Sequence, residues 1–131
     1  MTRPLRVLHV DDDADIREIA LLSLETVGGL DVLQCASGRE ALDGIDAFQP
    51  DVLLLDVMMP EMSGQQLLTE IRKLPGMSGV PAIFMTARVQ PAEIAAFREL
   101  GAADVIQKPF DPMALSSQLI ETVERCRVAA G

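Results

Sequence analysis

Short runs of apolar residues alternate along the chain with longer segments in which apolar residues recur every three or four positions. The short runs predict strands, and the longer segments predict helices that bury one face. Strands are expected over residues 5–10, 31–35, 52–55, 81–85 and 104–107. Helices are expected over residues 14–27, 39–48, 65–73, 91–100 and 112–128. Five such units predict an α/β fold in which crossover helices cover both faces of a parallel sheet.

The segment 52–55 contains no polar residue, so we expect it in the middle of the sheet, covered on both faces. In an open parallel sheet the binding crevice lies at the carboxyl ends of the strands. The residues that follow the predicted strands are therefore the most informative. Reactive groups follow four of the strands: Asp11, Asp12 and Asp13, then Asp56, Thr86 and Lys108. Turns alone do not require such residues.

The composition narrows the class of protein. The chain has 131 residues, 49% of them hydrophobic, which suits a single domain over residues 1–131 with its core in about residues 5–127. The net charge of -9 argues against direct binding to nucleic acid or anionic membranes. No signal peptide or membrane span is expected, so the protein should be cytoplasmic. His9, Cys35 and Cys126 are expected to be structural residues.

The acidic residues at the strand ends carry the strongest chemical signal. If Asp11, Asp12 and Asp56 lie within a few ångströms of one another, they cannot all stay ionised without a cation. Mg²⁺ suits an open crevice because it takes one or two carboxylates together with water and phosphate oxygens. Lys108 would add a second positive charge. Asp13 is expected to cap the helix that follows it.

Four segments together resemble the receiver domain of two-component response regulators. They are V-D-D-D at 10–13, L-L-L-D-V-M-M-P-E-M-S-G at 53–64, M-T-A at 85–87 and K-P-F at 108–110. Each segment is weak evidence alone, but the four occur in the right order after four predicted strands, and the resemblance covers almost the whole chain. It implies a flavodoxin-like, doubly wound sheet of five parallel strands in the order 2-1-3-4-5, with five helices.

The resemblance implies a role for each residue of the acidic cluster. Asp56 matches the phosphoacceptor, a carboxylate nucleophile that forms an aspartyl phosphate. Asp12 matches a direct ligand of Mg²⁺, and Asp11 matches a partner that acts mostly through metal-bound water. Asp56 and the backbone carbonyl of Met58 complete the implied set of protein ligands.

The other matching residues surround this cluster. Thr86 matches the hydroxyl that turns toward the phosphoryl oxygens, and Lys108 matches the cation that pairs with them. The bond between Lys108 and Pro109 is expected to be cis, a state tolerated before proline. Pro60 and Gly64 are expected to shape the loop after Asp56.

The implied function is transfer of a phosphoryl group to Asp56 from a phosphohistidine, supplied by a sensor histidine kinase or a histidine phosphotransfer protein. The domain would catalyse only its own phosphorylation and dephosphorylation, so it is not expected to be an enzyme. The charge added at one strand end would switch a protein-interaction surface. The output would be a downstream protein partner or a fused output domain, and the protein is either free-standing or part of a larger regulator. Homodimerisation is left open.

Three residues bear on how the switch works and how long the phosphoryl group lasts. Val105 stands where the family has an aromatic residue in strand five, so we expect switching through Thr86 and the loop 87–90 instead. Met58 and Arg88 flank the expected path of the hydrolytic water. Because methionine cannot orient water and arginine can shield the phosphoryl group, slow self-dephosphorylation is expected.

Two other functions remain open from the sequence. In a small aspartate-dependent phosphohydrolase, Asp11 would be the nucleophile and Asp13 the general acid, but Asp15 then replaces a threonine-like residue and Asp56 has no role. A receiver-like interaction module that is never phosphorylated is the third candidate, although such modules commonly lose a site residue and this chain keeps them all. Incubation with acetyl phosphate distinguishes a receiver from a phosphohydrolase, because only a receiver becomes stably labelled on Asp56.

Overall fold

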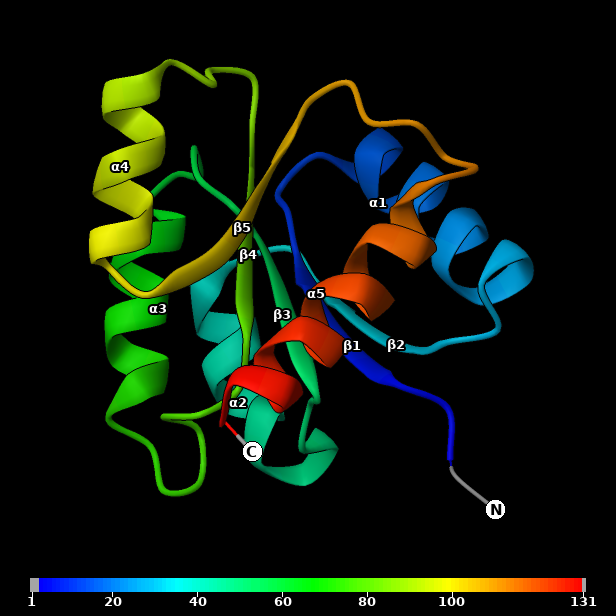
Figure 1. Cartoon of the computed structure of the whole chain (residues 1–131), viewed down its shortest axis with the longest axis horizontal. Coiled ribbons are helices and arrows are strands. Elements are labelled where there is room, and N and C mark those ends of the chain that lie inside the picture. The colour runs from blue at the N-terminus through cyan, green and yellow to red at the C-terminus, as the bar shows by residue number, and fades with distance from the viewer. Residues whose placement is uncertain (1–2, 131) are drawn as a thin grey trace.

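The computed structural model describes residues 3–130 and contains one five-stranded parallel sheet (Figure 1). The strands are β1 (Arg6–Val10), β2 (Asp31–Cys35), β3 (Val52–Asp56), β4 (Ala82–Thr86) and β5 (Ala102–Gln107). Their order across the sheet is β2-β1-β3-β4-β5, and each neighbouring pair is parallel. The predicted fold class and strand order are therefore confirmed.

Helices cover both faces of the sheet, as the alternating pattern predicted (Figure 1). They are α1 (Ala14–Leu21) with its π-helical continuation η1 (Leu22–Val27), α2 (Gly38–Phe48), α3 (Gly64–Arg72), α4 (Pro91–Glu99) and α5 (Leu115–Ala130). Buried residues of α2, α3 and α4 pack into one core. Those of α1, η1 and α5 pack into a second core on the other face.

The central strand β3 supplies both cores. Its residues are all buried, and along the strand they alternate, with Leu53 and Leu55 in one core and Val52 and Leu54 in the other. Each fully buried leucine of this kind stabilises the fold by about 1.5–3 kcal/mol relative to exposure. A strand buried on both faces cannot slide without losing these contacts, so its last residue, Asp56, is held firmly at the carboxyl end of the central strand.

The starts of α1 and α3 are set by side chains that accept hydrogen bonds from free backbone N–H groups. The carboxylate of Asp13 accepts from the backbone nitrogens of Asp15 and Ile16, so it caps α1 as predicted. Ser63 caps α3 in a capping box with Gln66. The first of these caps begins its helix directly after the acidic residues, which fixes where the chain leaves the end of β1.

Most helix boundaries lie within one or two residues of the sequence prediction, and two helices differ from it more clearly. The segment predicted as one α-helix over 14–27 widens after Leu21 into η1, where the N–H of Gly28 donates to the carbonyl of Ser23. The last helix begins at Leu115 and not at Pro112. The reason is a turn in which the Asp111 carboxylate accepts from the N–H of Met113, while the Pro112 carbonyl accepts from the Ser23 hydroxyl.

Within residues 3–130, no helix combines the length and apolar character needed to span a bilayer. The expected structural roles of the cysteines are consistent with their positions, since Cys35 is buried in the core, Cys126 is partly buried, and neither forms a disulfide.

Candidate functional site

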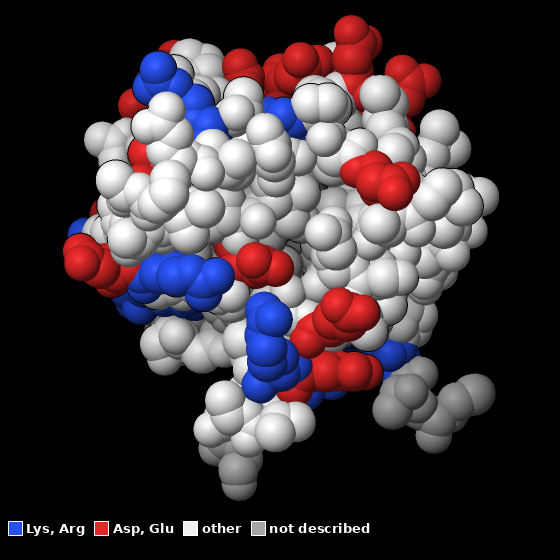
Figure 2. Space-filling view, turned by 45° about the horizontal axis from the view of Figure 1, so that its top comes forward, with Lys and Arg blue, Asp and Glu red and all other residues white. Residues whose placement is uncertain are grey.

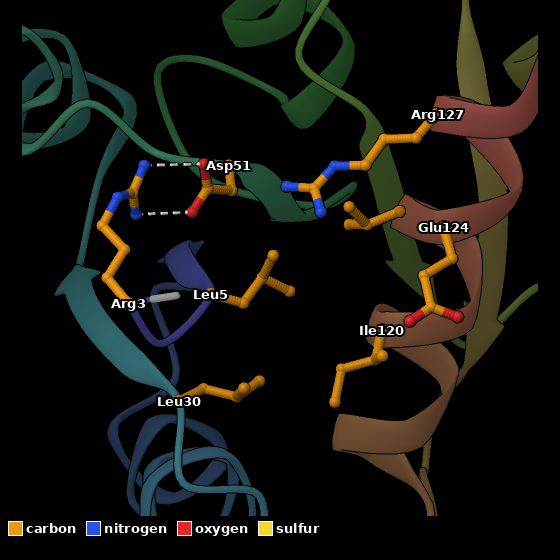
Figure 3. A pocket seen from close by; sticks show the side chains of 8 residues that line it. Arg3, Leu5, Leu30, Asp51, Ile120, Glu124 and Arg127 are labelled. Carbon is orange, nitrogen blue, oxygen red and sulfur yellow. Dashed lines mark hydrogen bonds and ion pairs between the residues drawn. The ribbon is translucent and has the colours of Figure 1, made fainter. Parts of the chain in front are cut away.

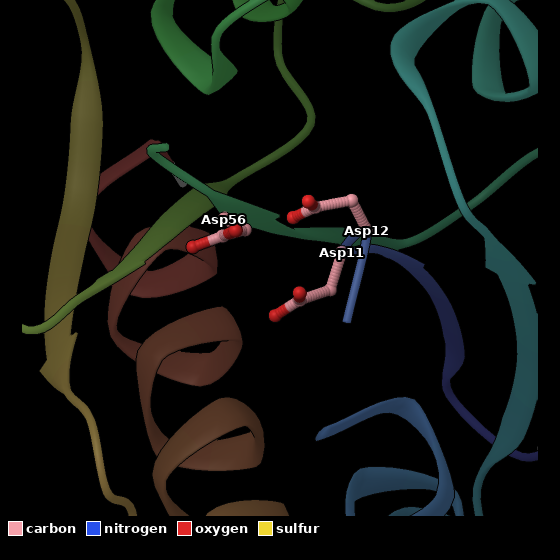
Figure 4. A group of neighbouring side chains, drawn as sticks. All are labelled: Asp11, Asp12 and Asp56. Atoms are coloured by element: carbon pink, nitrogen blue, oxygen red, sulfur yellow. The ribbon is translucent and has the colours of Figure 1, made fainter. Parts of the chain in front are cut away.

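The three aspartates singled out from the sequence meet at the carboxyl ends of β1 and β3. Asp11 follows β1 directly and has no exposed surface, while Asp56 ends β3 and is 5% exposed. One carboxylate oxygen from each of Asp11, Asp12 and Asp56 lies within 4.8 Å of the others. Figure 4 shows the three carboxylates side by side at these strand ends. Two come from neighbouring residues and the third from 44 positions later, so the pairing of β1 with β3 creates the cluster.

Lys108 is the cation of this cluster. It follows β5, and its Nζ lies 2.8 Å from Asp56 Oδ1 and 2.9 Å from Asp11 Oδ2. Burial lowers the pKa of the ammonium, but the hydrogen bond to Asp56 and the close contact with Asp11 outweigh that effect and leave the pKa raised. Lys108 therefore stays charged between the two carboxylates. The peptide bond that follows it, to Pro109, is cis.

One ammonium does not fully balance the carboxylates. Burial raises the pKa of Asp56 to about 6, Lys108 opposes that rise, and the charges of Asp11 and Asp12 add to it. The buried Oδ2 of Asp11 touches the ammonium without a well-aligned hydrogen bond. Neighbouring carboxylate oxygens, including the buried and under-bonded Oδ2 of Asp11, fit a hard divalent cation. The residues present can therefore hold a metal ion.

A cavity of about 250 Å³ opens over this cluster. Its lining residues are Asp11, Asp12, Asp13, Asp56, Met58, Thr86, Ala87 and Lys108. Thr86 ends β4, is 4% exposed, and its hydroxyl oxygen accepts a hydrogen bond from the N–H of Arg88. The cavity thus brings together acids, a hydroxyl and an ammonium from four strand ends.

The loop after Asp56 is closely packed against the site. A Cβ added at Gly64 would lie 2.3 Å from the backbone oxygen of Asp56, so only glycine fits the start of α3 at this distance from β3. Met59 and Met62 pack against the core, whereas Met58 is 78% exposed beside the cavity. Gly64 is therefore required by the site and is more than a turn former.

The positions expected to tune switching lie at different distances from the cavity. Arg88 is exposed and is not among the residues that line it. Val105 pairs with Phe84 across β4 and β5 and packs, partly buried, against the core of α2, α3 and α4. Neither residue is therefore among those that line the cavity over the acidic cluster.

The sequence reasoning missed a polar contact behind the acids. Arg17 Nη1 donates to the backbone carbonyl of Asp11 at 2.7 Å. Gln34 Nε2 donates to the carbonyl of Arg17 at 2.7 Å and lies 3.1 Å from His9 Nδ1. His9 was expected to be structural, and it is a fully buried strand residue. The sequence contains no pattern that predicts these contacts, because two of the hydrogen bonds are made to backbone carbonyls.

A larger cavity, of about 530 Å³, lies at the opposite end of the sheet (Figure 3). Leu5, Leu30, Ile120 and Val123 are its apolar lining. Two of its charged residues are paired, because the guanidinium of Arg3 donates two hydrogen bonds to the Asp51 carboxylate. Glu124 and Arg127 also line this cavity, but among the described residues it contains no cluster of neighbouring carboxylates like the one at the carboxyl ends of the strands.

Comparison with known proteins agrees with this geometry. The protein named "Probable transcriptional regulator ycf27" of Guillardia theta is 39% identical over 125 residues, which make up 95% of this chain and 48% of that protein. The DNA-binding response regulator MtrA of Mycobacterium tuberculosis is 35% identical over 120 residues, 92% of this chain and 51% of that protein. The chain spans about half the length of the curated relatives it matches.

Solved structures show the same fold. The chemotaxis protein CheY4 of Vibrio cholerae has a TM-score of 0.86 and 30% identity, covering 92% of this chain and 99% of that chain. The family model of the response regulator receiver domain matches residues 7–120, a range that includes all the strand ends described above. The chain therefore belongs to the response regulator receiver domain family, the receiver domains of two-component systems.

Proposed function

We propose that this chain accepts a phosphoryl group on Asp56 from a phosphohistidine of a sensor histidine kinase or a histidine phosphotransfer protein. The observation that carries the proposal is the contact of Asp56 with Lys108 at 2.8 Å inside a cavity that also holds two further carboxylates and a hydroxyl. Asp56 is the nucleophile, since it ends the central strand with an oxygen facing that cavity. The attack forms an Asp56 O–P bond as the P–N bond to the imidazole breaks.

We propose Mg²⁺ as the cofactor, held by Asp11, Asp12, Asp56 and the backbone carbonyl of Met58. When bound, it supplies charge neutralisation for the phosphoryl oxygens. Residues of the chain itself supply the nucleophile and a second positive charge. Asp56 remains largely ionised at neutral pH despite a pKa raised to about 6, and the Lys108 ammonium, fixed by two carboxylates, is placed to pair with transferred oxygens.

The switch begins at Thr86. Its hydroxyl oxygen accepts from the N–H of Arg88, so the hydroxyl proton is available for a new acceptor. A phosphoryl group on Asp56 adds up to two negative charges and strong acceptor oxygens. Rotation of the hydroxyl toward them gives up the bond to Arg88 and moves the loop 87–90 inward. The local change in charge thereby alters the surface that a partner contacts.

The remaining proposals concern the protein as a whole. We propose that residues 1–131 act as one receiver domain, with no catalysis beyond their own phosphorylation and dephosphorylation. Output passes to a protein partner or to a fused domain, in place of direct contact with nucleic acid. Support comes from the net charge of -9 and from Figure 2, where Lys and Arg side chains on the face in view form separate groups among Asp and Glu side chains.

Incubation with acetyl phosphate and Mg²⁺ tests the proposed function. The expected product is one acid-stable, base-labile phosphoryl group per chain, mapped to Asp56 by peptide mass spectrometry. The phosphohydrolase reading, with Asp11 as nucleophile, predicts instead turnover of varied phosphate esters without a stable label. A chain that takes up no phosphoryl group from acetyl phosphate, phosphoramidate or a phosphorylated histidine donor would favour the non-phosphorylated interaction module.

The exposed Met58 and Arg88 are expected to make the phosphoryl group long-lived. Methionine offers no hydrogen bond to orient the hydrolytic water, and arginine can pair with the phosphoryl oxygens. The variant carrying Met58→Asn and Arg88→Glu should therefore lose the label at least several times faster than the native chain. The decay of radiolabelled protein in EDTA-quenched and Mg²⁺-containing samples measures this rate. An unchanged decay in the double variant would show that these side chains do not set the lifetime.

Switching should extend beyond the immediate site although Val105 replaces the aromatic residue. Binding of beryllofluoride, a phosphoryl mimic, is expected to shift backbone amide resonances of Thr86, the loop 87–90, the start of α4 and the region of Val105. Val105 packs in the core that α4 also uses, which provides the mechanical connection. Shifts limited to the loop after Asp56, measured by heteronuclear NMR, would contradict this expectation.

A further inference from the structure

A continuous set of polar contacts lies behind the acidic cluster and joins three elements. Arg17 comes from α1, Gln34 from β2 and His9 from β1. The Arg17 guanidinium donates to the Asp11 carbonyl at 2.7 Å, and the Arg17 carbonyl accepts from Gln34 at 2.7 Å. The same Gln34 nitrogen lies 3.1 Å from His9 Nδ1. Arg17 is thus held at its backbone while its side chain holds the end of β1.

The hydrogen bonds fix the state of each group. Because the Gln34 nitrogen donates to a carbonyl, it is an amide NH₂, and His9 Nδ1 must accept from it. The His9 proton is therefore on Nε2. Burial, with smaller contributions from Lys108 and Arg17, lowers the pKa of His9 to about 3, so the ring is neutral at physiological pH. The set acts as a rigid support with one charge, that of Arg17.

We propose that Arg17 is a positioning residue for the cation and phosphoryl site. The Asp11 carbonyl belongs to the peptide that leads into Asp12, so a guanidinium bound to it sets the plane of that peptide and the direction of the exposed Asp12 carboxylate. The other contacts of Asp11 use its N–H, which donates to the Cys35 carbonyl, and its carboxylate, which meets the Asp13 N–H and Lys108. They do not involve the carbonyl that Arg17 binds. The inference rests on the proposed function, because it assigns Arg17 to the Mg²⁺ site.

The positioning role of Arg17 and its positive charge predict opposite effects on Mg²⁺ affinity when the residue is replaced. As a nearby cation, Arg17 repels Mg²⁺, so loss of its charge alone should strengthen Mg²⁺ binding. If Arg17 supports the peptide that carries a metal ligand, its replacement should weaken Mg²⁺ binding. Replacing residues that orient metal ligands typically lowers metal affinity about 10–100-fold. Lysine separates the two effects, because it keeps the charge but lacks the planar guanidinium fork of arginine.

The experiment is a calorimetric Mg²⁺ titration of the full chain, since the sequence contains no Trp or Tyr to report binding by fluorescence. Native protein is compared with Arg17→Met, Arg17→Lys and the control Arg98→Met, which removes an exposed arginine of α4. Both Arg17 variants should bind Mg²⁺ roughly tenfold more weakly, with the control unchanged. Equal affinity in all four proteins, or tighter binding by Arg17→Met with Arg17→Lys unchanged, overturns the inference.

A second readout needs no metal. In metal-free protein, the backbone ¹⁵N resonance of Asp12 reports the hydrogen bond to the Asp11 carbonyl, and it should shift in both Arg17 variants but not in Arg98→Met. An unmoved Asp12 resonance contradicts the positioning role. If native protein binds no Mg²⁺, the proposed function fails, while the Asp12 resonance still decides whether Arg17 holds the peptide. If Arg17→Met does not fold, Arg17→Lys provides both readouts.

Discussion

Replacement of Asp56 by asparagine should abolish phosphoryl uptake while leaving the fold intact. Asparagine has nearly the same shape, and its side-chain oxygen can still accept from Lys108 at the end of β3. An amide oxygen does not form a stable acyl phosphate, so no label should accumulate after incubation with acetyl phosphate and Mg²⁺. Intact mass spectrometry measures the fraction of chains that carry a phosphoryl group, and circular dichroism verifies folding.

Asp13→Asn is the matched control for this prediction. Asp13 lines the same cavity and caps α1, and asparagine caps helices about as well as aspartate. This variant should therefore take up the phosphoryl group at a rate close to the native one. The phosphohydrolase hypothesis predicts the reverse: Asp13→Asn should lose activity and Asp56→Asn should keep it, because Asp13 is its general acid. Labelling of Asp56→Asn to the native extent would exclude Asp56 as the acceptor.

Lys108→Met should cost about 3 kcal/mol or more of the free energy of unfolding at pH 7 without metal. The lysine side chain is 19% exposed and contacts the buried oxygens of Asp11 and Asp56, so its removal leaves two buried carboxylates without their partner. Chemical denaturation measured with and without Mg²⁺ tests this, and added Mg²⁺ should restore part of the loss. The exposed pair of Lys73 with Glu70 gives the control, since Lys73→Met removes a surface ion pair of about 0–1 kcal/mol.

The loss in Lys108→Met should also depend on pH. The pKa of Asp56 is raised from its ordinary value of 3.8 to about 6, chiefly by burial. A carboxyl group with a raised native pKa binds its proton more tightly when folded, so its contribution to stability falls as the pH rises from about 4 to about 6. At pH 5 Asp56 is mostly neutral, so it interacts less strongly with Lys108. The difference in the free energy of unfolding between the native protein and Lys108→Met should therefore be smaller at pH 5 than at pH 7. A loss below about 1 kcal/mol at pH 7, like that of a surface pair, would contradict the account.

Most of the fold was readable from the sequence because its signals are local. The uninterrupted apolar run at Val52 to Leu55 placed β3 in the centre, and the switch from apolar runs to helical spacing located every helix. The start of α5 was wrong by three residues, because a proline suits the first turn of a helix but here lies in a turn held by Asp111 and Ser23. Contacts made across the fold decide that boundary, and they leave no mark in the local pattern.

Part of the candidate site could also be predicted from the sequence, and part could not. The acids, Thr86 and Lys108 were predictable because parallel strands bring their carboxyl ends to one edge, and the structure gathers all of them around one cavity. The required closeness of Gly64 to the Asp56 carbonyl, and the contact of Arg17 with the Asp11 carbonyl, were not predictable. Both involve backbone atoms of distant residues, whose approach is known only once the packing of helix on sheet is known.

A crystal structure of the protein with Mg²⁺ and beryllofluoride tests the central claim most directly. We expect one metal ion at about 2.1 Å from oxygens of Asp12 and Asp56, with beryllofluoride on the other oxygen of Asp56 and its fluorines in contact with Lys108 and Thr86. Crystals grown with saturating Mg²⁺ in which the acidic cluster binds no ion, or in which beryllofluoride occupies a different carboxylate, would contradict the account.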